Sequence, residues 1–119
     1  MIYYSSLTGN TRRFVKKTGL PAVEIKCGMK AIKPFVIVTY TIGFGQVPQI
    51  VDEFLKQNSD LLCGVAVSGN RNWGDSYGKA GDIIANKYNV PLLLKFELAG
   101  TDDDVKTFKE RVVKCGISN

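Results

Sequence analysis

The sequence predicts an α/β protein in which helices flank a doubly wound parallel sheet, and three observations support this prediction. Two continuous runs rich in β-branched residues, PFVIVTY and LLCGVAV, are typical of strands covered on both faces. Between such runs apolar residues recur at helical spacing, so strands and helices alternate along the chain. The length of 119 residues is near the commonest domain size, and we expect residues 1–119 to form a single domain.

Five segments are expected to form strands. The first is apolar and aromatic without a turn residue, and the two β-branched runs supply the third and fourth. The predicted strands are residues 2–5, 22–26, 35–40, 61–67 and 91–97. Parallel sheets of this kind bind ligands at the carboxyl ends of their strands, so the loops that follow strands are the candidate site.

Four segments are expected to form helices. Asn10 or Thr11 is expected to cap the first helix, whose inner face includes Phe14 and Val15. Pro48 suits the first turn of the second helix. The predicted helices are residues 10–18, 48–58, 77–88 and 102–114.

The composition argues against several kinds of chemistry. The chain has no histidine, which removes Ser-His and Cys-His catalytic pairs and the common zinc sites, and we predict no metal ligands. Its three cysteines, Cys27, Cys63 and Cys115, are far apart in sequence and are expected to be reduced thiols. No apolar run approaches the roughly 20 residues of a membrane span. No signal peptide is readable, and the expected location is the cytoplasm.

The net charge of +5 is unevenly distributed. Residues 1–33 hold seven lysines and arginines against one acid, Glu24, whereas the rest of the chain is nearly balanced. A basic edge over residues 12–33 suits nucleic acid, an acidic protein partner or an anionic ligand, and it is also what an ordinary solvated face looks like.

Three loops follow predicted strands, and each is rich in glycine or in hydrogen-bonding side chains. Their sequences are SSLTGNT, TIGFGQVP and SGNRNWGDSYG. The first leads into a helix, a geometry that suits an anion as well as a plain capped turn. The other two add Phe44, Trp73 and Tyr77 among flexible glycines. Together the three loops suit a ligand that has a phosphate at one end and a large flat ring at the other.

Three other ligand-binding or phospho-acceptor motifs of α/β proteins are excluded by particular residues. A P-loop needs Gly-Lys before Ser or Thr, and the chain has none. The dinucleotide fingerprint GxGxxG is missing from the first loop, and in GFGQVP the residue Pro48 stands where its third glycine belongs. A phospho-acceptor receiver needs acids after the first and third strands, where this chain has Ser5, Ser6, Tyr40 and Thr41.

The stretch SxTGN resembles the phosphate loop of flavodoxins, which bind flavin mononucleotide (FMN). Together with VTYTIGFGQVP, SGNRNWGDSYGKAG and KFELAGTDDDV it resembles the NrdI family, small flavodoxin-like activators of class Ib ribonucleotide reductase. The resemblance runs from Ile2 to about Arg111. It implies a flavodoxin-like three-layer sandwich, with a five-stranded parallel sheet of order 2-1-3-4-5 and helices on both faces.

The resemblance also implies a set of FMN-binding residues. The first loop would hold the phosphate, the second would line the ring beside its N5, and the third would meet the pyrimidine edge, with Trp73 or Tyr77 stacking on the ring. Trp73 packing under its own loop is the alternative, and Phe96 and Leu98 are expected in the core. The implied residues are Ser6, Leu7, Thr8, Gly9, Asn10, Thr11, Thr41, Ile42, Gly43, Phe44, Gly45, Ser68, Gly69, Asn70, Trp73, Gly74 and Tyr77.

Gly43 is the residue to which the resemblance assigns a catalytic role. When a flavin takes up an electron and a proton, its N5 changes from an acceptor to a donor. A peptide carbonyl that turns toward N5 then stabilises the reduced form, and that turn favours a positive φ, which glycine adopts cheaply. A plain tight turn at Gly43 and Gly45 is the alternative.

In the family that the chain resembles, the reduced flavin reacts with dioxygen. The superoxide formed passes to the dimanganese site of the reductase small subunit and assembles its manganese–tyrosyl radical cofactor. The chain would then be an accessory redox protein without its own small-molecule substrate, served by an unidentified electron donor and binding neither nucleic acid nor membrane. A general electron-transfer flavodoxin is the alternative. A nucleic-acid module using the basic edge leaves the glycine loops unexplained.

Overall fold

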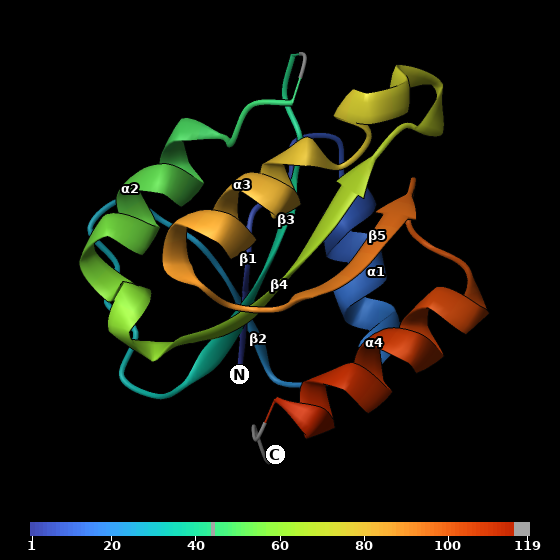
Figure 1. Ribbon diagram of the computed structural model, residues 1–119. Coiled ribbons are helices and arrows are strands. Elements are labelled where there is room, and N and C mark those ends of the chain that lie inside the picture. The colour runs from blue at the N-terminus through green and yellow to red at the C-terminus, as the bar shows by residue number, and fades with distance from the viewer. Residues whose placement is uncertain (44, 116–119) are drawn as a thin grey trace.

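Five parallel strands form one sheet in the order β2-β1-β3-β4-β5 in the computed structural model, which describes residues 1–43 and 45–115 (Figure 1). Every neighbouring pair of strands is parallel. The strands are β1 (Ile2–Tyr4), β2 (Ala22–Glu24), β3 (Phe35–Tyr40), β4 (Leu62–Gly69) and β5 (Leu92–Glu97). The predicted fold class and strand order are confirmed.

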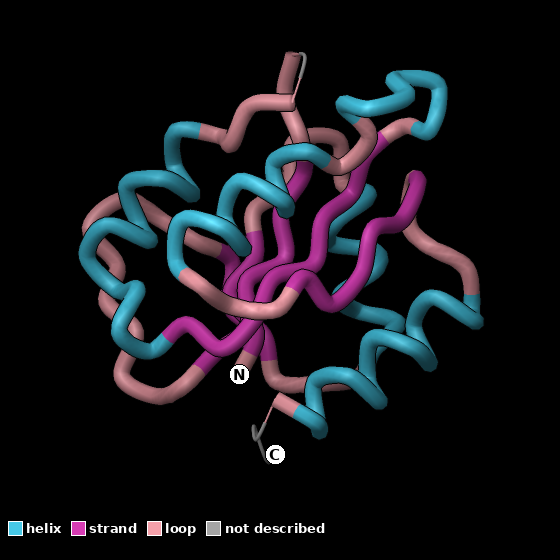
Figure 2. The backbone as a smooth tube through the Cα atoms, viewed as in Figure 1, coloured by secondary structure: helices cyan, strands magenta, loops and turns pink. Residues whose placement is uncertain are grey.

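Within the described residues, α-helices cover both faces of this sheet. The helices are α1 (Asn10–Thr18), α2 (Gln49–Asn58), α3 (Lys79–Tyr88) and α4 (Asp102–Lys114). Helices α1 and α4 pack on one face and α2 and α3 on the other, so the sheet is the middle of three layers (Figure 2). None of these helices is long and apolar enough to cross a membrane.

The core under α1 and α4 supports the elements that lead into the site. Phe14 of α1 stacks on Phe96 of β5, with ring centroids 4.0 Å apart and planes inclined by 14°. Phe108 of α4 meets Phe14 edge-on at 5.3 Å, and all three side chains are fully buried. Phe96 is therefore a core residue, as predicted. The contact fixes α1, which follows the first loop, relative to the end of β5.

The opposite face has its own aromatic cluster. Tyr3, Phe35 and Phe54 lie with ring centroids 5.1 to 5.5 Å apart and join β1 and β3 to α2. The central strand β3 supplies both cores because its side chains alternate between the two faces. Val36 and Val38 belong to the first core, and Phe35 and Ile37 to the second.

Helix starts are where the structure departs most from expectation. Neither Asn10 nor Thr11 caps α1, so that prediction was wrong. The residue before the helix is Gly9, with φ of 90°, and no side chain of its own caps the end. The third helix begins two residues later than predicted, because Gly78, with φ of 60°, is the cap residue before α3. Two short 3₁₀ segments were not predicted: η2 (Arg71–Ser76), which precedes α3, and η1 (Ser59–Leu61), which precedes β4.

Candidate functional site

A cleft of about 270 Å³ opens at the carboxyl ends of β1, β3 and β4. The loops after these strands meet at the top of the molecule in the view of Figure 1. The cleft is lined by residues of all three predicted loops and of the segment after β5: Leu7, Thr8, Asn10, Thr11, Tyr40, Thr41, Gly43, Ser68, Gly69, Asn70, Trp73, Ser76, Gly78, Glu97 and Leu98. The parallel sheet therefore gathers distant parts of the sequence at one place.

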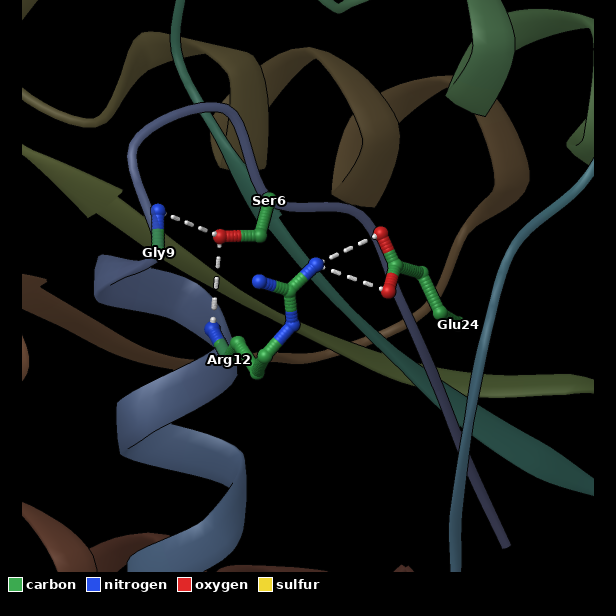
Figure 3. Close-up of polar contacts among 4 residues, drawn as sticks. All are labelled: Ser6, Gly9, Arg12 and Glu24. Atoms are coloured by element: carbon green, nitrogen blue, oxygen red, sulfur yellow. Dashed lines mark hydrogen bonds and ion pairs between the residues drawn. The ribbon is translucent and has the colours of Figure 1, made fainter.

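The first loop is held by the hydroxyl of Ser6. Its Oγ accepts a hydrogen bond from the backbone N–H of Gly9 at 3.0 Å and a longer one from that of Arg12 at 3.4 Å (Figure 3). The positive φ of Gly9 lets the chain turn directly into α1. Ser6 thus takes over the acceptor role that an N-cap side chain would supply.

The start of α1 faces the cleft. The first turn of a helix has backbone N–H groups without intrahelical acceptors, and the helix dipole adds partial positive charge there. Thr8, Asn10 and Thr11 line this part of the cleft. The amide oxygen of Asn10 accepts a hydrogen bond from the guanidinium of Arg13 at 2.6 Å, which brings a cation to the loop. The arrangement suits a bound anion.

An ion pair joins the same helix start to the edge of the sheet. The Arg12 guanidinium Nη2 lies 2.9 Å and 3.1 Å from the two carboxylate oxygens of Glu24, the last residue of β2 (Figure 3). The Glu24 carboxylate, with a smaller contribution from Tyr4, raises the pKa of Arg12. The guanidinium is therefore charged throughout the physiological pH range.

The second loop forms a closed turn. Ile42 and Gln46 exchange two backbone hydrogen bonds, of 3.0 Å and 2.7 Å. Gly43 has φ of 53° and lines the cleft, so the positive φ expected of it is present. Gly45 has φ of 118°, and a Cβ there would lie 2.7 Å from the Lys79 side chain of α3. The predicted residue Phe44 lies outside the described residues.

Hydroxyl groups tie the second and third loops together. Thr41 Oγ1 donates to the backbone carbonyl of Ser68 at 3.2 Å, and Ser68 Oγ donates to the carbonyl of Leu98 at 3.3 Å. Since both hydroxyls donate to the protein, their lone pairs remain for a ligand N–H. Asn70 caps η2, its side-chain oxygen accepting from the N–H of Asn72 at 2.8 Å, so its amide N–H groups and one oxygen lone pair remain for a ligand. Gly69 needs to be glycine because a Cβ there would lie 2.8 Å from the backbone nitrogen of Gly78.

The two aromatic residues of the third loop have different environments. Trp73 lines the cleft and is 47% exposed. Tyr77 does not line the cleft. Its ring lies 5.8 Å from the Arg71 guanidinium carbon and 5.8 Å from the Lys95 ammonium nitrogen. Its hydroxyl is buried and has no hydrogen-bond partner among the described residues, although its proximity raises the pKa of Arg71.

The segment after β5 was missed as part of the site. Leu98 was expected in the core, and that expectation was wrong: its side chain is 71% exposed and lines the cleft. Its backbone φ is 53°, a conformation that is energetically unfavourable for any residue with a Cβ atom. Glu97 lines the cleft as well, accepting the N–H of Arg71 at 3.1 Å and pairing with the Arg71 Nε at 3.4 Å. No local pattern in KFELAG indicates an exposed leucine; only its place after a strand does.

Of the predicted residues that the structure describes, ten line the cleft and six do not. Those that line the cleft are Leu7, Thr8, Asn10, Thr11, Thr41, Gly43, Ser68, Gly69, Asn70 and Trp73. Those that lie beside it without lining it are Ser6, Gly9, Ile42, Gly45, Gly74 and Tyr77. The lining residues that sequence reasoning did not select are Tyr40, Ser76, Gly78, Glu97 and Leu98. Ser76 and Gly78 lie within the third predicted loop without having been selected, and Tyr40 directly precedes the second.

The strand order and the cleft at the carboxyl ends of the strands together define a protein with the flavodoxin fold. The chain is similar to a short-chain flavodoxin associated with a non-canonical PDU bacterial microcompartment, with a TM-score of 0.77. The superposition covers 98% of this chain and 97% of that one, at 18% sequence identity, so the likeness concerns the fold alone.

The amino-acid sequence identifies the family within the flavodoxin fold. It matches the NrdI flavodoxin-like family over residues 2–110. Because the match covers nearly all of the chain, the protein belongs to this family.

The residues present fit an FMN molecule. The helix start with its hydroxyl loop provides N–H and O–H donors for a phosphate. The cleft of about 270 Å³ is close to the lower end of the range of about 300–1,000 Å³ that is typical of small-molecule sites. Trp73 and Leu98 supply apolar surface for a flat ring.

Proposed function

We propose that the cleft binds FMN and that the protein activates the small subunit of a class Ib ribonucleotide reductase. The match to the NrdI flavodoxin-like family over residues 2–110 carries this proposal. Bound FMN, once reduced, would supply single electrons to dioxygen, one electron for each superoxide formed. Superoxide would then oxidise the dimanganese site of the reductase subunit, where the manganese–tyrosyl radical is assembled.

The phosphate end of FMN is assigned to the first loop. Thr8 and the first turn of α1 at Asn10 and Thr11 provide donors, and the helix dipole favours the negative charge. Gly9 gives the chain the turn that lets these groups converge. Ser6 holds the loop in shape through its two accepted hydrogen bonds.

The ring end is assigned to the second and third loops and the segment after β5. Trp73 and Leu98 bind the ring by apolar contact, and Ser68 and Asn70 offer hydrogen bonds to its polar edge. Tyr77 is not assigned to stacking because it lies off the cleft. Gly43, with its positive φ, would let its peptide carbonyl accept a hydrogen bond from N5–H of the reduced ring.

The rim of the cleft is assigned to the reductase subunit. Three large apolar side chains around the opening are strongly exposed: Leu7 at 69%, Trp73 at 47% and Leu98 at 71%. Exposed apolar residues that gather at one place mark contact surfaces. A subunit covering this rim would keep superoxide from bulk water during its transfer.

Electron transfer to other redox proteins is the second candidate, because it needs only a flavin bound in the same cleft. The two proposals differ in the fate of the electrons. An activator gives them to dioxygen, whereas an electron carrier keeps them until its partner docks.

The test is assembly of the radical cofactor. The FMN-loaded protein is reduced anaerobically, mixed with a Mn²⁺-loaded class Ib small subunit and exposed to air, and the tyrosyl radical is measured by electron paramagnetic resonance. We expect radical in proportion to added protein. Free reduced FMN at equal concentration is the control. Equal radical yield in both samples, or none in either, would refute the activator proposal.

A further inference from the structure

The Arg12–Glu24 ion pair stands out because it uses the one acidic residue among residues 1–33, where seven basic residues lie. Two neighbouring cations on α1, Lys16 and Lys17, lie in its last turn, far from the first loop. Glu24 instead pairs with Arg12, the residue whose backbone N–H also binds Ser6 of that loop. The same residue is therefore attached at its main chain to the loop and at its side chain to the sheet (Figure 3).

Both ends of this connection are fixed. Glu24 is the last residue of β2 and lies opposite Tyr4 in the register of the sheet. Directly after it, the N–H of Ile25 donates to the carbonyl of Tyr4 at 2.7 Å. On the other side, Ser6 Oγ connects Arg12 to Gly9. The ion pair thus spans the gap between the edge strand and the helix start.

The helix start needs such support. Gly9 provides no side-chain cap, and glycine has the greatest freedom to leave the conformation required. Apart from the small side chain of Thr11, which is buried in the first turn, α1 is held on this side by Phe14 and Val15, which pack one turn further along. The N–H groups that would face a phosphate lie before that point.

We propose that Arg12 and Glu24 are positioning residues, a clamp that holds the hydroxyl loop and the first turn of α1 in the conformation that accepts the FMN phosphate. This inference rests on the proposed function, since it requires FMN in the cleft. Neither side chain lines the cleft. The clamp acts on the loop and is not a ligand.

The competing explanation is that Arg12 attracts the phosphate directly by its charge. The two explanations predict opposite effects of removing Glu24. If Arg12 acts by charge, Glu24→Gln frees that charge and tightens FMN binding. If the pair is a clamp, Glu24→Gln loosens the loop and weakens FMN binding.

The experiment compares the dissociation constants of FMN and riboflavin, measured by fluorescence quenching, for the wild type, Arg12→Gln, Glu24→Gln and the exchanged pair Arg12→Glu with Glu24→Arg. Riboflavin has the ring without the phosphate, so the ratio of the two constants reports the phosphate site alone. The pair is exposed by 43% and 37% at its two side chains, and the expected loss is about two- to five-fold. We expect both single variants to lose FMN affinity, riboflavin affinity to stay unchanged, and the exchanged pair to recover most of the loss.

Lys56→Gln is the matched control, since it breaks the exposed Lys56–Asp52 pair on α2, away from the cleft. Tighter FMN binding by Glu24→Gln would overturn the clamp in favour of direct charge attraction. An unchanged ratio, or equal loss of both flavins, would overturn it in favour of a surface pair or a general structural role. A wild type that binds neither flavin would refute the proposed function itself, and the clamp with it.

Discussion

At the scale of single residues, Leu98 has a backbone conformation that leucine disfavours. A leucine with φ of 53° costs about 1–2 kcal/mol relative to a relaxed backbone. Its side chain recovers little of that by burial, because it is 71% exposed. Strain that burial does not offset is typical of functional positions. We attribute the strained backbone of Leu98 to its position at the rim of the cleft.

Leu98 substitutions should separate stability from binding. Asn tolerates positive φ, so Leu98→Asn should keep or raise the midpoint of thermal unfolding while it weakens FMN binding several-fold. The β-branched control Leu98→Val should lower the midpoint. Thermal unfolding and FMN titration of both variants check this. An unfolding midpoint for Leu98→Asn well below that of the wild type would show that the leucine contributes to the core.

The three cysteines should differ in reactivity with pH. Cys27 is exposed, whereas Cys115 is partly covered and donates from Sγ to the carbonyl of Cys63 at 3.2 Å. Burial, and secondarily the neighbouring Cys63, raises the pKa of Cys115. The thiolate is the reactive form, so Cys115 should react slowly near neutral pH and faster as pH rises.

Iodoacetamide labelling at pH 7.5 with peptide mass mapping is the measurement. We expect label at Cys27 first, and Cys27→Ser should remove this early label. Early label at Cys115 would contradict the burial in the structure.

At the scale of elements, Lys95 of β5 holds the third loop. Its Nζ donates to the carbonyl of Tyr77 at 3.0 Å and to the carboxylate of Asp82 in α3 at 2.7 Å. With 27% of its side chain exposed, it is better covered than the basic partners of the other ion pairs among the described residues. It therefore joins β5, the end of the loop and α3 at one point.

Replacing Lys95 by Met keeps the apolar stem and removes the charge. We expect faster hydrogen exchange over residues 70–78 and weaker FMN binding, because the loop loses its anchor. Lys56→Met, which breaks an exposed pair on α2, should leave both unchanged. Exchange in residues 70–78 that does not differ from the wild type would show that the loop is held by other contacts.

Most helices and strands could be predicted from the sequence, because the spacing of apolar residues indicates which side chains are buried. The β-branched runs gave β3 and most of β4, and the apolar spacing gave α1 and α4 with their observed bounds. The capping position at Gly9 and the later start of α3 after Gly78 were not predicted. Both depend on positive φ at a glycine, and a sequence with many glycines does not say which of them turn.

The part of the site that lies at the ends of strands could be predicted from the sequence. The three loops were predicted because parallel strands share one carboxyl edge. The exposure of Leu98 and the pairing of Glu97 with Arg71 depend on contacts between β5 and the third loop, which lie about 26 residues apart in sequence. Such contacts follow from the folded sheet and not from any local pattern.

At the scale of the whole molecule, charge bears on how easily the flavin is fully reduced. Glu97 is the charged residue that lines the cleft in the described part of the chain, and Arg71 pairs with it. The net charge of the chain is +5. A cleft whose lining carboxylate is paired with a cation disfavours an added negative charge less than acidic surroundings do, so the second electron should enter at a potential close to that of the first.

The most direct test of the central claim is an anaerobic reductive titration of the FMN-loaded protein, followed by readmission of air. We predict two one-electron potentials that lie close together, then rapid reoxidation in air with superoxide detected by a cytochrome c assay sensitive to superoxide dismutase. Two widely separated potentials, with a radical form of the flavin that persists in air, would contradict the activator account and indicate an electron carrier.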